Sequence, residues 1–219
     1  MNNHQPDHCC GVCSTQTRPF LNVGGRDYWR CDSCMATFLD PAHWLSPEME
    51  HARYLEHHND LTDTGYRKFL SKLAGPLLEK LAPDRDGLDY GCGPGPALAQ
   101  MLNEAGHRVS IFDPFFFPDK ALLDKKYDFI TCTETIEHFH RPAEEFDRLC
   151  RMLNPGGWLA IMTCFQTDDT RFSTWHYNRD LTHVVFYRET TLRLVANILG
   201  LSCEIPAKDI TLMQKPLDQ

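Results

Sequence analysis

The sequence lacks the usual marks of a membrane or secreted protein. No eighteen consecutive residues are apolar, and Met1 to His8 have neither the basic start nor the apolar run of a signal peptide. Basic residues are also few, because 22 Lys and Arg stand against 30 Asp and Glu and leave a net charge of −8. A general nucleic-acid surface depends on clustered Lys and Arg, so this composition argues against one, although a local basic patch stays open. We expect a soluble, cytoplasmic protein without a membrane partner.

Cysteine, by contrast, is frequent, and its distribution separates two parts of the chain. Five of the ten cysteines lie before residue 35, and the others are scattered through the apolar pattern of the following residues. The scattered ones are Cys92, Cys132, Cys150, Cys164 and Cys203. Small buried thiols are ordinary in a large domain, so we do not expect a disulfide scaffold. With 219 residues, the chain can form one substantial α/β core and a small appendage.

Four of the early cysteines form two Cys-x-x-Cys pairs with the spacing of metal ligands. The pairs are Cys10–Cys13 and Cys31–Cys34, and Gly24-Gly25 between them is suited to a hairpin tip. Four thiolates can bind one tetrahedral zinc ion and leave no position for a substrate, so the arrangement resembles a zinc ribbon with a structural Zn²⁺. The predicted ligands are Cys10, Cys13, Cys31 and Cys34. Cys9 fits less well because it would leave a three-residue spacer before Cys13, and four free or redox-active thiols are the alternative.

A glycine-rich turn between two predicted strands indicates a nucleotide-containing cofactor. We expect a strand over Gly87 to Tyr90, then a turn, and then a helix that starts at Pro96 and stops near Gly106. Arg108 to Phe112 reads as the next strand, and Asp113 follows it directly. An acidic side chain at the end of such a strand can accept hydrogen bonds from both hydroxyls of a ribose. The order of strand, turn, helix, strand and acid therefore favours an adenosine-containing ligand over a plain loop.

The spacing of the glycines distinguishes between two cofactors. The dinucleotide fingerprint needs Gly or Ala as its sixth residue, and counting Gly91 as the first places Pro96 there, which weakens a nicotinamide reading. The segment instead resembles the first motif of the class I S-adenosylmethionine-dependent methyltransferases, Asp-x-Gly-x-Gly-x-Gly. Asp89, Gly91, Gly93 and Gly95 stand in the matching places.

Three later segments extend this resemblance over residues 66 to 214. They are Tyr127 to Ile130 with Glu134, Glu137 and His138 after it, Leu153 to Leu159, and His183 to Tyr187 with a helix that ends at Gly200. The resemblance implies a Rossmann-like α/β fold: a mostly parallel sheet with helices on both faces and a C-terminal antiparallel hairpin. Leu201 to Ile205 and Ile210 to Met213 would form that hairpin.

The resemblance also implies a cofactor site at the carboxyl ends of the strands. The predicted residues are Tyr66, Asp89, Gly91, Cys92, Gly93, Gly95, Asp113, Pro114, Phe115, Thr133 and Glu134. Tyr66 could equally be a packing residue, and one of Phe115, Phe116 and Phe117 could stack on adenine. Only thirteen residues separate the second strand from the fourth-strand segment, so the usual helix and third strand must be abbreviated or lost. Asp119 or Asp124 could replace the acidic adenine contact of that strand.

Histidines mark the predicted acceptor side. His138 and His183 are the candidate catalytic residues, either as bases or as groups that hold their loops. The polar stretch around His183 supplies candidates for the acceptor pocket: Trp175, His176, Tyr177, Arg179, Asp180 and His183. Asp180 could instead cap a turn, and His183 could be a satisfied interior histidine. Arg179 could recognise a carboxylate or a phosphate.

We expect three parts along the chain: a zinc ribbon over 1–45, a helical linker over 46–65 and a methyltransferase domain over 66–219. The linker helix would be capped by Ser46 and run to about His58, and the apolar stretch after Gly65 would be interrupted at Gly75-Pro76. The predicted activity is methyl transfer from S-adenosylmethionine to an acceptor, most simply a small molecule. An RNA-modifying methyltransferase and a non-enzymatic zinc-ribbon adapter are the alternatives. No motif indicates the acceptor atom or the oligomeric state.

Overall fold

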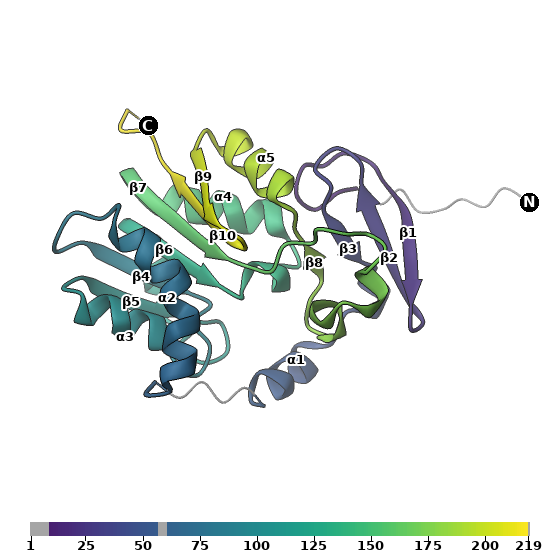
Figure 1. Cartoon of the computed structure of the whole chain (residues 1–219), viewed down its shortest axis with the longest axis horizontal. Coiled ribbons are helices and arrows are strands. Elements are labelled where there is room, and N and C mark those ends of the chain that lie inside the picture. The colour runs from purple at the N-terminus through teal and green to yellow at the C-terminus, as the bar shows by residue number, and fades with distance from the viewer. Residues whose placement is uncertain (1–8, 57–60, 219) are drawn as a thin grey trace, which may run out of the picture.

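A six-stranded sheet forms the centre of the computed structural model, which describes residues 9–56 and 61–218. Its strands are β4 (Asp86–Tyr90), β5 (Arg108–Phe112), β6 (Tyr127–Thr133), β7 (Leu153–Met162), β9 (Ser202–Ala207) and β10 (Ile210–Gln214). They lie in the order β5-β4-β6-β7-β10-β9, parallel from β5 to β7, with β10 antiparallel to both β7 and β9 (Figure 1). The predicted mostly parallel sheet and C-terminal hairpin are thus confirmed.

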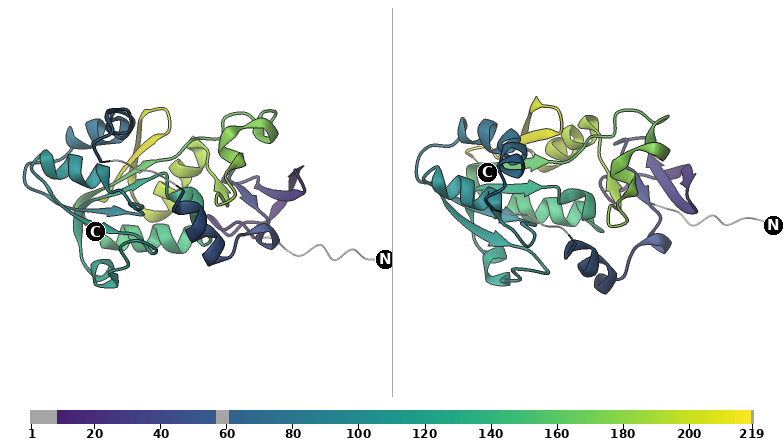
Figure 2. Two further views of the ribbon diagram at one scale, coloured as in Figure 1. Left: turned by 90° about the horizontal axis from the view of Figure 1, so that it is seen from below. Right: turned by 60° about the horizontal axis from the view of Figure 1, so that its bottom comes forward.

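Helices cover both faces of this sheet, because its central strands carry apolar side chains on both sides. Helices α2 (Thr64–Leu78) and α3 (Ala97–Glu104) pack on one face, where Leu73 and Leu102 share a cluster with Phe129 of β6. Helices α4 (Pro142–Met152) and α5 (Glu189–Leu199) cover the other face, where Leu149 and Leu192 belong to the core cluster of Ile130 (Figures 1 and 2). Phe129 and Ile130, which are neighbours in β6, thus pack against helices on opposite faces of the sheet.

One helix prediction was wrong in extent, and another reaches residues outside the described part of the chain. Helix α2 continues through Gly75 and Pro76 instead of breaking there. A proline in a helix loses one N–H bond, but Leu73 and Leu77 on either side both pack into the core, and their burial outweighs that loss. Helix α1 (Pro47–Tyr54) begins with Ser46 as its cap, as predicted, yet ends at Tyr54. The predicted end at His58 lies outside the described residues.

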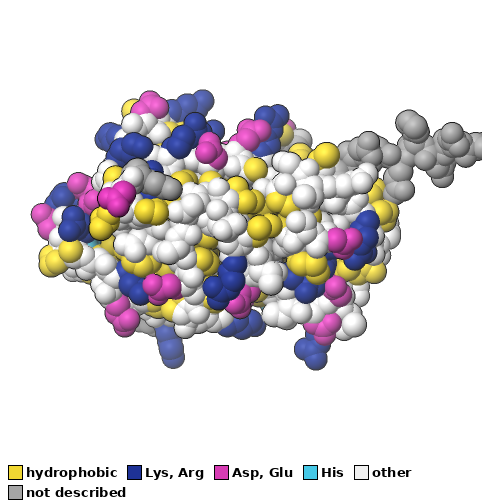
Figure 3. Space-filling model, turned by 90° about the horizontal axis from the view of Figure 1, so that it is seen from above, with side chains coloured by type: hydrophobic (Ala, Val, Ile, Leu, Met, Phe, Trp, Pro, Cys, Tyr) yellow, Lys and Arg dark blue, Asp and Glu magenta, His cyan; other side chains and the backbone are white. Residues whose placement is uncertain are grey.

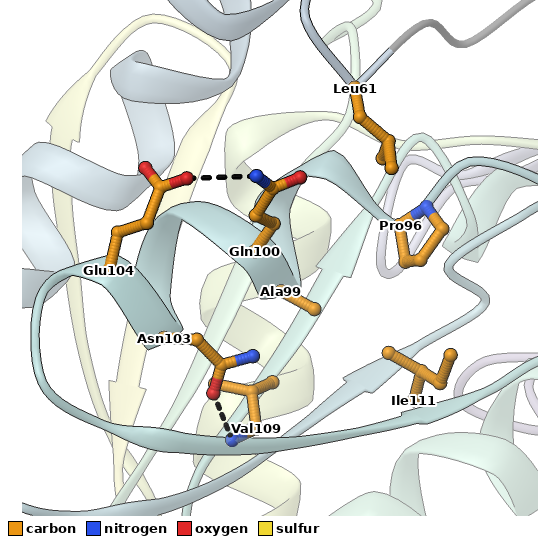
Figure 4. A pocket seen from close by; sticks show the side chains of 8 residues that line it. All are labelled: Leu61, Pro96, Ala99, Gln100, Asn103, Glu104, Val109 and Ile111. Atoms are coloured by element: carbon orange, nitrogen blue, oxygen red, sulfur yellow. Dashed lines mark hydrogen bonds between the residues drawn. The ribbon is translucent and has the colours of Figure 1, made fainter.

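Strand β5 is the edge of the sheet, since the usual third strand is absent from the described segment between β5 and β6. Only a short 3₁₀ helix, η2 (Lys120–Asp124), stands there. The side-chain oxygen of Asn103 accepts a hydrogen bond from the backbone N–H of Val109 at 2.9 Å on this edge (Figure 4). A surface pocket of about 540 Å³ lies between α3 and β5, and Figure 4 labels its lining residues. The abbreviated connection that the sequence predicted is therefore confirmed.

The N-terminal region folds as a small sheet that a later strand completes. Strands β1 (Thr17–Val23), β2 (Arg26–Cys31) and β3 (Thr37–Leu39) are antiparallel neighbours, and β8 (Val185–Phe186) pairs with β3. Gly24 and Gly25, both with positive φ, form the predicted hairpin tip. Tyr28 and Phe186 belong to one continuous core cluster that reaches the large sheet. The boundary at residue 45 stays a prediction.

The remaining elements are short. They are η1 (Pro41–His43), η3 (Ile136–His138), η4 (Phe172–Thr174) and η5 (His176–Arg179). The predicted turn over Leu153 to Leu159 is part of β7, which accommodates Gly156 with a φ of 77°. Within the described part of the chain, no helix has the length and apolar character needed to span a membrane.

Candidate functional site

The glycine turn after β4 leaves no room for a side chain at Gly91. Gly91 has a φ of 75°, and a Cβ built on it would lie 2.2 Å from Cγ2 of Thr135. Gly93 has a φ of 65°, a conformation that favours glycine as well. The N–H groups of Gly91 and Cys92 both donate to the carbonyl oxygen of Phe112, which fixes the turn against β5. The backbone at the end of β4 is therefore tightly placed.

Asp113 joins this turn to the end of β5. Its Oδ2 accepts a hydrogen bond from the N–H of Gly93 at 3.0 Å, and its Oδ1 accepts from the N–H groups of Phe115 at 2.9 Å and Phe116 at 3.1 Å. The side chain is buried, with 7% of its surface exposed. Three backbone donors hold the carboxylate in one orientation, so Asp113 is a preorganised acceptor at the mouth of the turn.

Asp89 supports the turn from within the sheet. It is buried, and its Oδ1 accepts a hydrogen bond from Oγ1 of Thr131 at 2.7 Å. Burial raises the pKa of Asp89 to about 6, partly offset by that hydrogen bond. Tyr66 of α2 lies on the same side: burial and the charges of Asp89 and Glu134 raise its pKa to about 12. The predicted contact of Tyr66 with the site is thus compatible with its position, and Tyr66 also packs on Phe69.

The end of β6 contributes polar groups to the same edge. Oγ1 of Thr133 is buried and has no hydrogen-bond partner among the described residues. Glu134 adopts a left-handed backbone, with a φ of 49°, and its N–H donates to the carbonyl oxygen of Met162. A strained non-glycine residue beside an unsatisfied buried hydroxyl is typical of a functional site. These residues come from the strand next to β4, so they face the same region as the glycine turn.

The aromatic residues after Asp113 lie against helix α1. The ring of Phe115 stacks on His51 at 5.3 Å between centroids and lies 5.4 Å from Tyr54. Phe115, Phe116 and Phe117 are all partly exposed, so none of them is a fully buried core residue. Asp119 caps η2 by accepting a hydrogen bond from Ala121, which gives it a structural task. Pro114 and Asp124 are exposed, whereas Cys92 is partly buried and Gly95 is buried.

The two predicted catalytic histidines lie together. Their ring centroids are 4.8 Å apart, although His138 ends η3 and His183 precedes β8. Nδ1 of His138 is 3.0 Å from the carbonyl oxygen of Thr182, and Nδ1 of His183 is 2.7 Å from that of Tyr177. Burial lowers the pKa of His138, which favours its neutral form. Each Nδ1 donates to a backbone carbonyl in this arrangement, which places the lone pair of the neutral ring on Nε2.

Glu137 lies beneath these rings and is fully buried. Tyr177 donates its hydroxyl to Oε1 of Glu137, and Oγ1 of Thr163 donates to Oε2 at 3.0 Å. Burial raises the pKa of Glu137, and burial together with repulsion from Glu137 raises the pKa of Glu134. The sequence pattern pointed to His138 but gave no role to Glu137, and nothing in it indicated that Tyr177 would reach a carboxylate 40 residues earlier.

The polar stretch over 175–183 divides into two groups. Tyr177 is buried, Trp175 packs on it, and His183 contacts it with ring centroids 4.2 Å apart. His176 and Arg179 are exposed, and Arg179 only approaches a carbonyl oxygen of its own loop at 3.5 Å. Asp180 accepts hydrogen bonds from the N–H and Oγ1 of Thr182, which is the turn-capping alternative. Tyr177 of the first group reaches Glu137 with its hydroxyl.

Helix α1 covers the space between the aromatic residues and the histidines. Tyr54 lies 5.4 Å from His138 as well as from Phe115, and burial raises its pKa well above the usual range. Glu50, also buried, has an oxygen 3.2 Å from Nε2 of His140. The sequence marked α1 only as a linker helix. Its amphipathic pattern gives no sign that it lies over the site.

The four predicted metal ligands form a separate cluster. Sγ of Cys10 is 3.5 Å from Sγ of Cys34, and Sγ of Cys13 is 3.5 Å from Sγ of Cys31. All four sulfur atoms lie within 4.8 Å of one another. Four thiolates at about 2.3 Å from one zinc ion would be about 3.8 Å apart, so the cluster fits such an ion. Cys9 is exposed and lies outside this group.

Comparison with known proteins gives one family and several structural relatives. A family model described as a methyltransferase domain matches residues 54–204. A search of curated proteins finds no match. Among solved structures, 1,6-didemethyltoxoflavin-N1-methyltransferase of Burkholderia thailandensis, with 1,6-didemethyltoxoflavin and S-adenosylhomocysteine bound, is similar at a TM-score of 0.55 and 17% identity, over 90% of this chain and 99% of that one.

Two further structures share the fold. Magnesium protoporphyrin IX methyltransferase of Synechocystis PCC 6803, with bound S-adenosylhomocysteine, has a TM-score of 0.53 and 15% identity over 78% of this chain and 94% of that chain. An O-methyltransferase family protein of Burkholderia thailandensis has a TM-score of 0.52 and 18% identity over 78% of this chain. The match spans 64% of that protein's length. At these identities the likeness concerns the fold.

Proposed function

The chain belongs to the methyltransferase-domain family, and on that premise we propose that it transfers the methyl group of S-adenosylmethionine to a small-molecule acceptor. The cofactor supplies an electrophilic methyl carbon on a sulfonium. The protein then has to place an acceptor in line with that carbon and keep water out. The observation that carries the proposal is the carboxylate of Asp113, which three backbone N–H groups hold beside the Gly91 turn.

The residues around this carboxylate fit an adenosine-containing ligand. In our proposal, Asp113 accepts hydrogen bonds from the ribose hydroxyls, and Gly91 and Gly93 let the ligand approach the backbone closely. Oγ1 of Thr133, buried without a partner among the described residues, is available to a polar group of the ligand. The proposed cofactor-binding residues remain Tyr66, Asp89, Gly91, Cys92, Gly93, Gly95, Asp113, Pro114, Phe115, Thr133 and Glu134.

A small acceptor is supported by the charge of the surface. Figure 3 shows Lys and Arg side chains interspersed with Asp and Glu on one face. Many basic residues pair with carboxylates, as Arg67 does with Glu104 and Arg108 with Asp86. A polyanion such as RNA binds where several cations lie together without acidic partners. Two of the structural relatives are named for small molecules, a toxoflavin precursor and a magnesium porphyrin, which agrees with this choice.

We propose that His138 and His183 act on the acceptor. Both Nδ1 atoms contact backbone carbonyls, so each neutral ring would present an Nε2 lone pair to a group bound between them. The partly buried Trp175 and the buried Tyr177 would form the wall of that space, and Tyr54 of α1 would cover it. Arg179 and His176 are exposed and would reach only the outer part of an acceptor.

The ribbon has a separate proposed task. A Zn²⁺ ion held by Cys10, Cys13, Cys31 and Cys34 would have four protein ligands and would be structural. Its folding free energy would stabilise a region that buries little apolar surface alone. The ribbon also pairs with β8, directly after His183, so it would hold the acceptor side of the domain in place.

Binding of S-adenosylhomocysteine, measured by calorimetry on zinc-replete protein, tests the cofactor site. We expect saturable binding with one site per chain. Asp113→Asn should weaken it by about 10- to 100-fold, because charged hydrogen bonds of about 1.5 to 3 kcal/mol would be lost. Asp147→Asn is the matched control, since Asp147 lies on the exposed side of α4 in a pair with Arg151. Absence of binding by the folded wild-type protein would refute the proposed function.

The acceptor class has its own test. Purified protein is incubated with methyl-labelled S-adenosylmethionine and a cell extract that has been separated into small molecules, RNA and protein. We expect label in the small-molecule fraction. Label confined to RNA would support the RNA-modifying alternative, and no label in any fraction, despite cofactor binding, would favour an adapter.

A further inference from the structure

A second cluster of potential metal ligands lies outside the ribbon. Glu137, His138 and His183 each direct one ligand atom to a common region, and these atoms lie within 4.8 Å of one another. They come from two segments: η3 supplies Glu137 and His138, and the loop before β8 supplies His183. The two segments are also tied by a backbone hydrogen bond from Val184 to the carbonyl oxygen of Glu137. The fold therefore assembles this set from distant parts of the chain.

The surroundings of the three side chains resemble those of bound metal ligands. Metal-binding histidines usually donate their other ring N–H to a carbonyl or carboxylate, which fixes the ring and its tautomer. Here Nδ1 of His138 contacts the carbonyl of Thr182 at 3.0 Å, and Nδ1 of His183 contacts that of Tyr177 at 2.7 Å. Glu137 is held in the same way, by the hydroxyl groups of Tyr177 and Thr163. Each candidate ligand thus has an orienting partner.

The charge balance gives an independent reason for a cation. Glu137 is fully buried, and its two oxygens accept hydrogen bonds from the neutral hydroxyl groups of Tyr177 and Thr163. Among the described residues, no Lys or Arg forms an ion pair with Glu137 or Glu134. Lys72 is the nearby cation that acts on Glu134, at longer range. Buried carboxylates without a cationic partner are costly, and a bound metal ion is one way to compensate them.

We propose that Glu137, His138 and His183 bind one divalent transition-metal ion at the acceptor side of the domain. One carboxylate and two neutral imidazoles suit Mn²⁺, Fe²⁺, Co²⁺ or Zn²⁺ and leave coordination positions open. An acceptor with an oxygen or nitrogen donor could occupy such a position. The binding of an acceptor to the metal rests on the proposed function, whereas the binding of the metal itself does not. The imidazoles would then serve as ligands, and the metal-bound acceptor would lose its proton to solvent or to a nearby carboxylate.

The site differs from the cysteine cluster in its donor atoms, which makes the two separable. Four thiolates select zinc strongly, so zinc-replete protein keeps that cluster filled. Mn²⁺ prefers oxygen and imidazole donors over thiolates, and its free form has a sharp electron paramagnetic resonance signal. Mn²⁺ is therefore the probe, titrated without S-adenosylmethionine into protein that holds one zinc ion per chain, verified by elemental analysis, and no free zinc, because excess zinc would also fill the second site. Loss of the free-ion signal counts the bound ions.

We expect one bound Mn²⁺ per chain. His138→Ala and His183→Ala should each weaken binding by at least about tenfold, and Glu137→Gln should do so while keeping the shape of the side chain. His140→Ala is the matched control, because His140 lies two residues from His138 but packs on Trp44 and faces Glu50. It should bind Mn²⁺ like the wild type. S-Adenosylhomocysteine binding and the melting temperature of each variant verify that the cofactor site and fold are intact.

Two results would overturn the proposal. One is wild-type protein that binds neither Mn²⁺ nor Co²⁺ beyond its zinc at millimolar concentration. The other is Mn²⁺ binding that stays unchanged in all three variants. Both results can occur with normal S-adenosylhomocysteine binding, so failure of the metal site would be distinguishable from failure of the proposed function.

Discussion

Oγ1 of Thr191 donates a hydrogen bond to the carbonyl oxygen of Cys34, 2.8 Å away, and so connects the first turn of α5 to the cysteine cluster. A second connection joins the N–H of Ala143, in the first turn of α4, to the carbonyl oxygen of Gly11 at 3.0 Å. Both helices that cover one face of the sheet are therefore bonded at their first turns to the N-terminal region. These two hydrogen bonds join the cysteine cluster to the large domain.

The first prediction follows from these connections. Cys34→Ser should lower the zinc content below one ion per chain and lower the melting temperature of the whole protein, because α4 and α5 lose the backbone that anchors their first turns. Elemental analysis and calorimetry measure the two effects. Cys9→Ser is the control, since Cys9 is exposed and outside the cluster, and it should change neither. A zinc-free variant with an unaltered single transition would contradict the coupling.

A buried ion pair provides the second prediction. The guanidinium of Arg30 is fully buried, and its Nη2 is 2.6 Å from Asp169, whose side chain is 46% exposed. Asp169→Ala would leave Arg30 and Arg188 without the carboxylate that they share and should cost about 2 to 3 kcal/mol, less than for a wholly buried pair. Chemical denaturation measures this. Asp32→Ala, which removes the exposed partner of Arg18, should cost less than about 1 kcal/mol, and equal costs for both variants would count against this view.

The third prediction concerns close packing between β4 and β6. A Cβ on Gly87 would lie 2.1 Å from the ring of Phe129, which is fully buried and cannot move aside. Gly87→Ala should therefore destabilise the protein by about 1 to 3 kcal/mol, and Phe129→Leu should recover part of the loss in the double variant. Gly75→Ala meets no atom within 4 Å and lies inside α2, so it should not destabilise the protein, and the higher helix propensity of Ala favours a gain of up to about 1 kcal/mol. Additive effects of the two core changes would speak against a direct clash.

The fourth prediction is a pH dependence of stability. The pKa of Asp89 is about 6 in the folded protein and 3.8 as its ordinary value, because burial disfavours the charged form. The contribution of the neutral Asp89 carboxyl to the stability of the fold is fully present below pH 3.8 and is lost as the pH rises through 6. Asp89→Asn keeps an acceptor for Thr131 and should gain stability at pH 7.5 relative to pH 5, on the order of 1 kcal/mol. Denaturation at both pH values checks this, and an equal effect at the two would contradict the raised pKa.

Local signals allowed much of the fold to be predicted. Strand β5 over Arg108–Phe112 and the helix stop at Gly200 agree closely with the structure, because strands and caps are marked by neighbouring residues. The passage of α2 through Pro76 was missed, since the benefit comes from distant packing partners of Leu73 and Leu77. Local propensity cannot report a tertiary gain of that kind.

The candidate site was predicted only as far as its motifs. The Gly91 turn directly follows β4, and Asp113 directly follows β5. The contact between them could therefore be predicted from the order of the elements. The contact of Tyr177 with Glu137 depends on the path of a 40-residue connection. The approach of Tyr54 to His138 depends on where α1 packs, which no periodicity encodes.

The bare outer strand β5 has a consequence for how the molecule meets copies of itself. The backbone of an unpaired edge strand can form hydrogen bonds with another chain. Because the usual third strand is absent, β5 is such an edge. Asn103 occupies the N–H of Val109 with its own amide oxygen, and Arg108 at the start of the strand carries charge. Asn103 and Arg108 therefore protect this edge from pairing with another chain. Replacing them with small apolar residues should favour aggregation before it affects the fold.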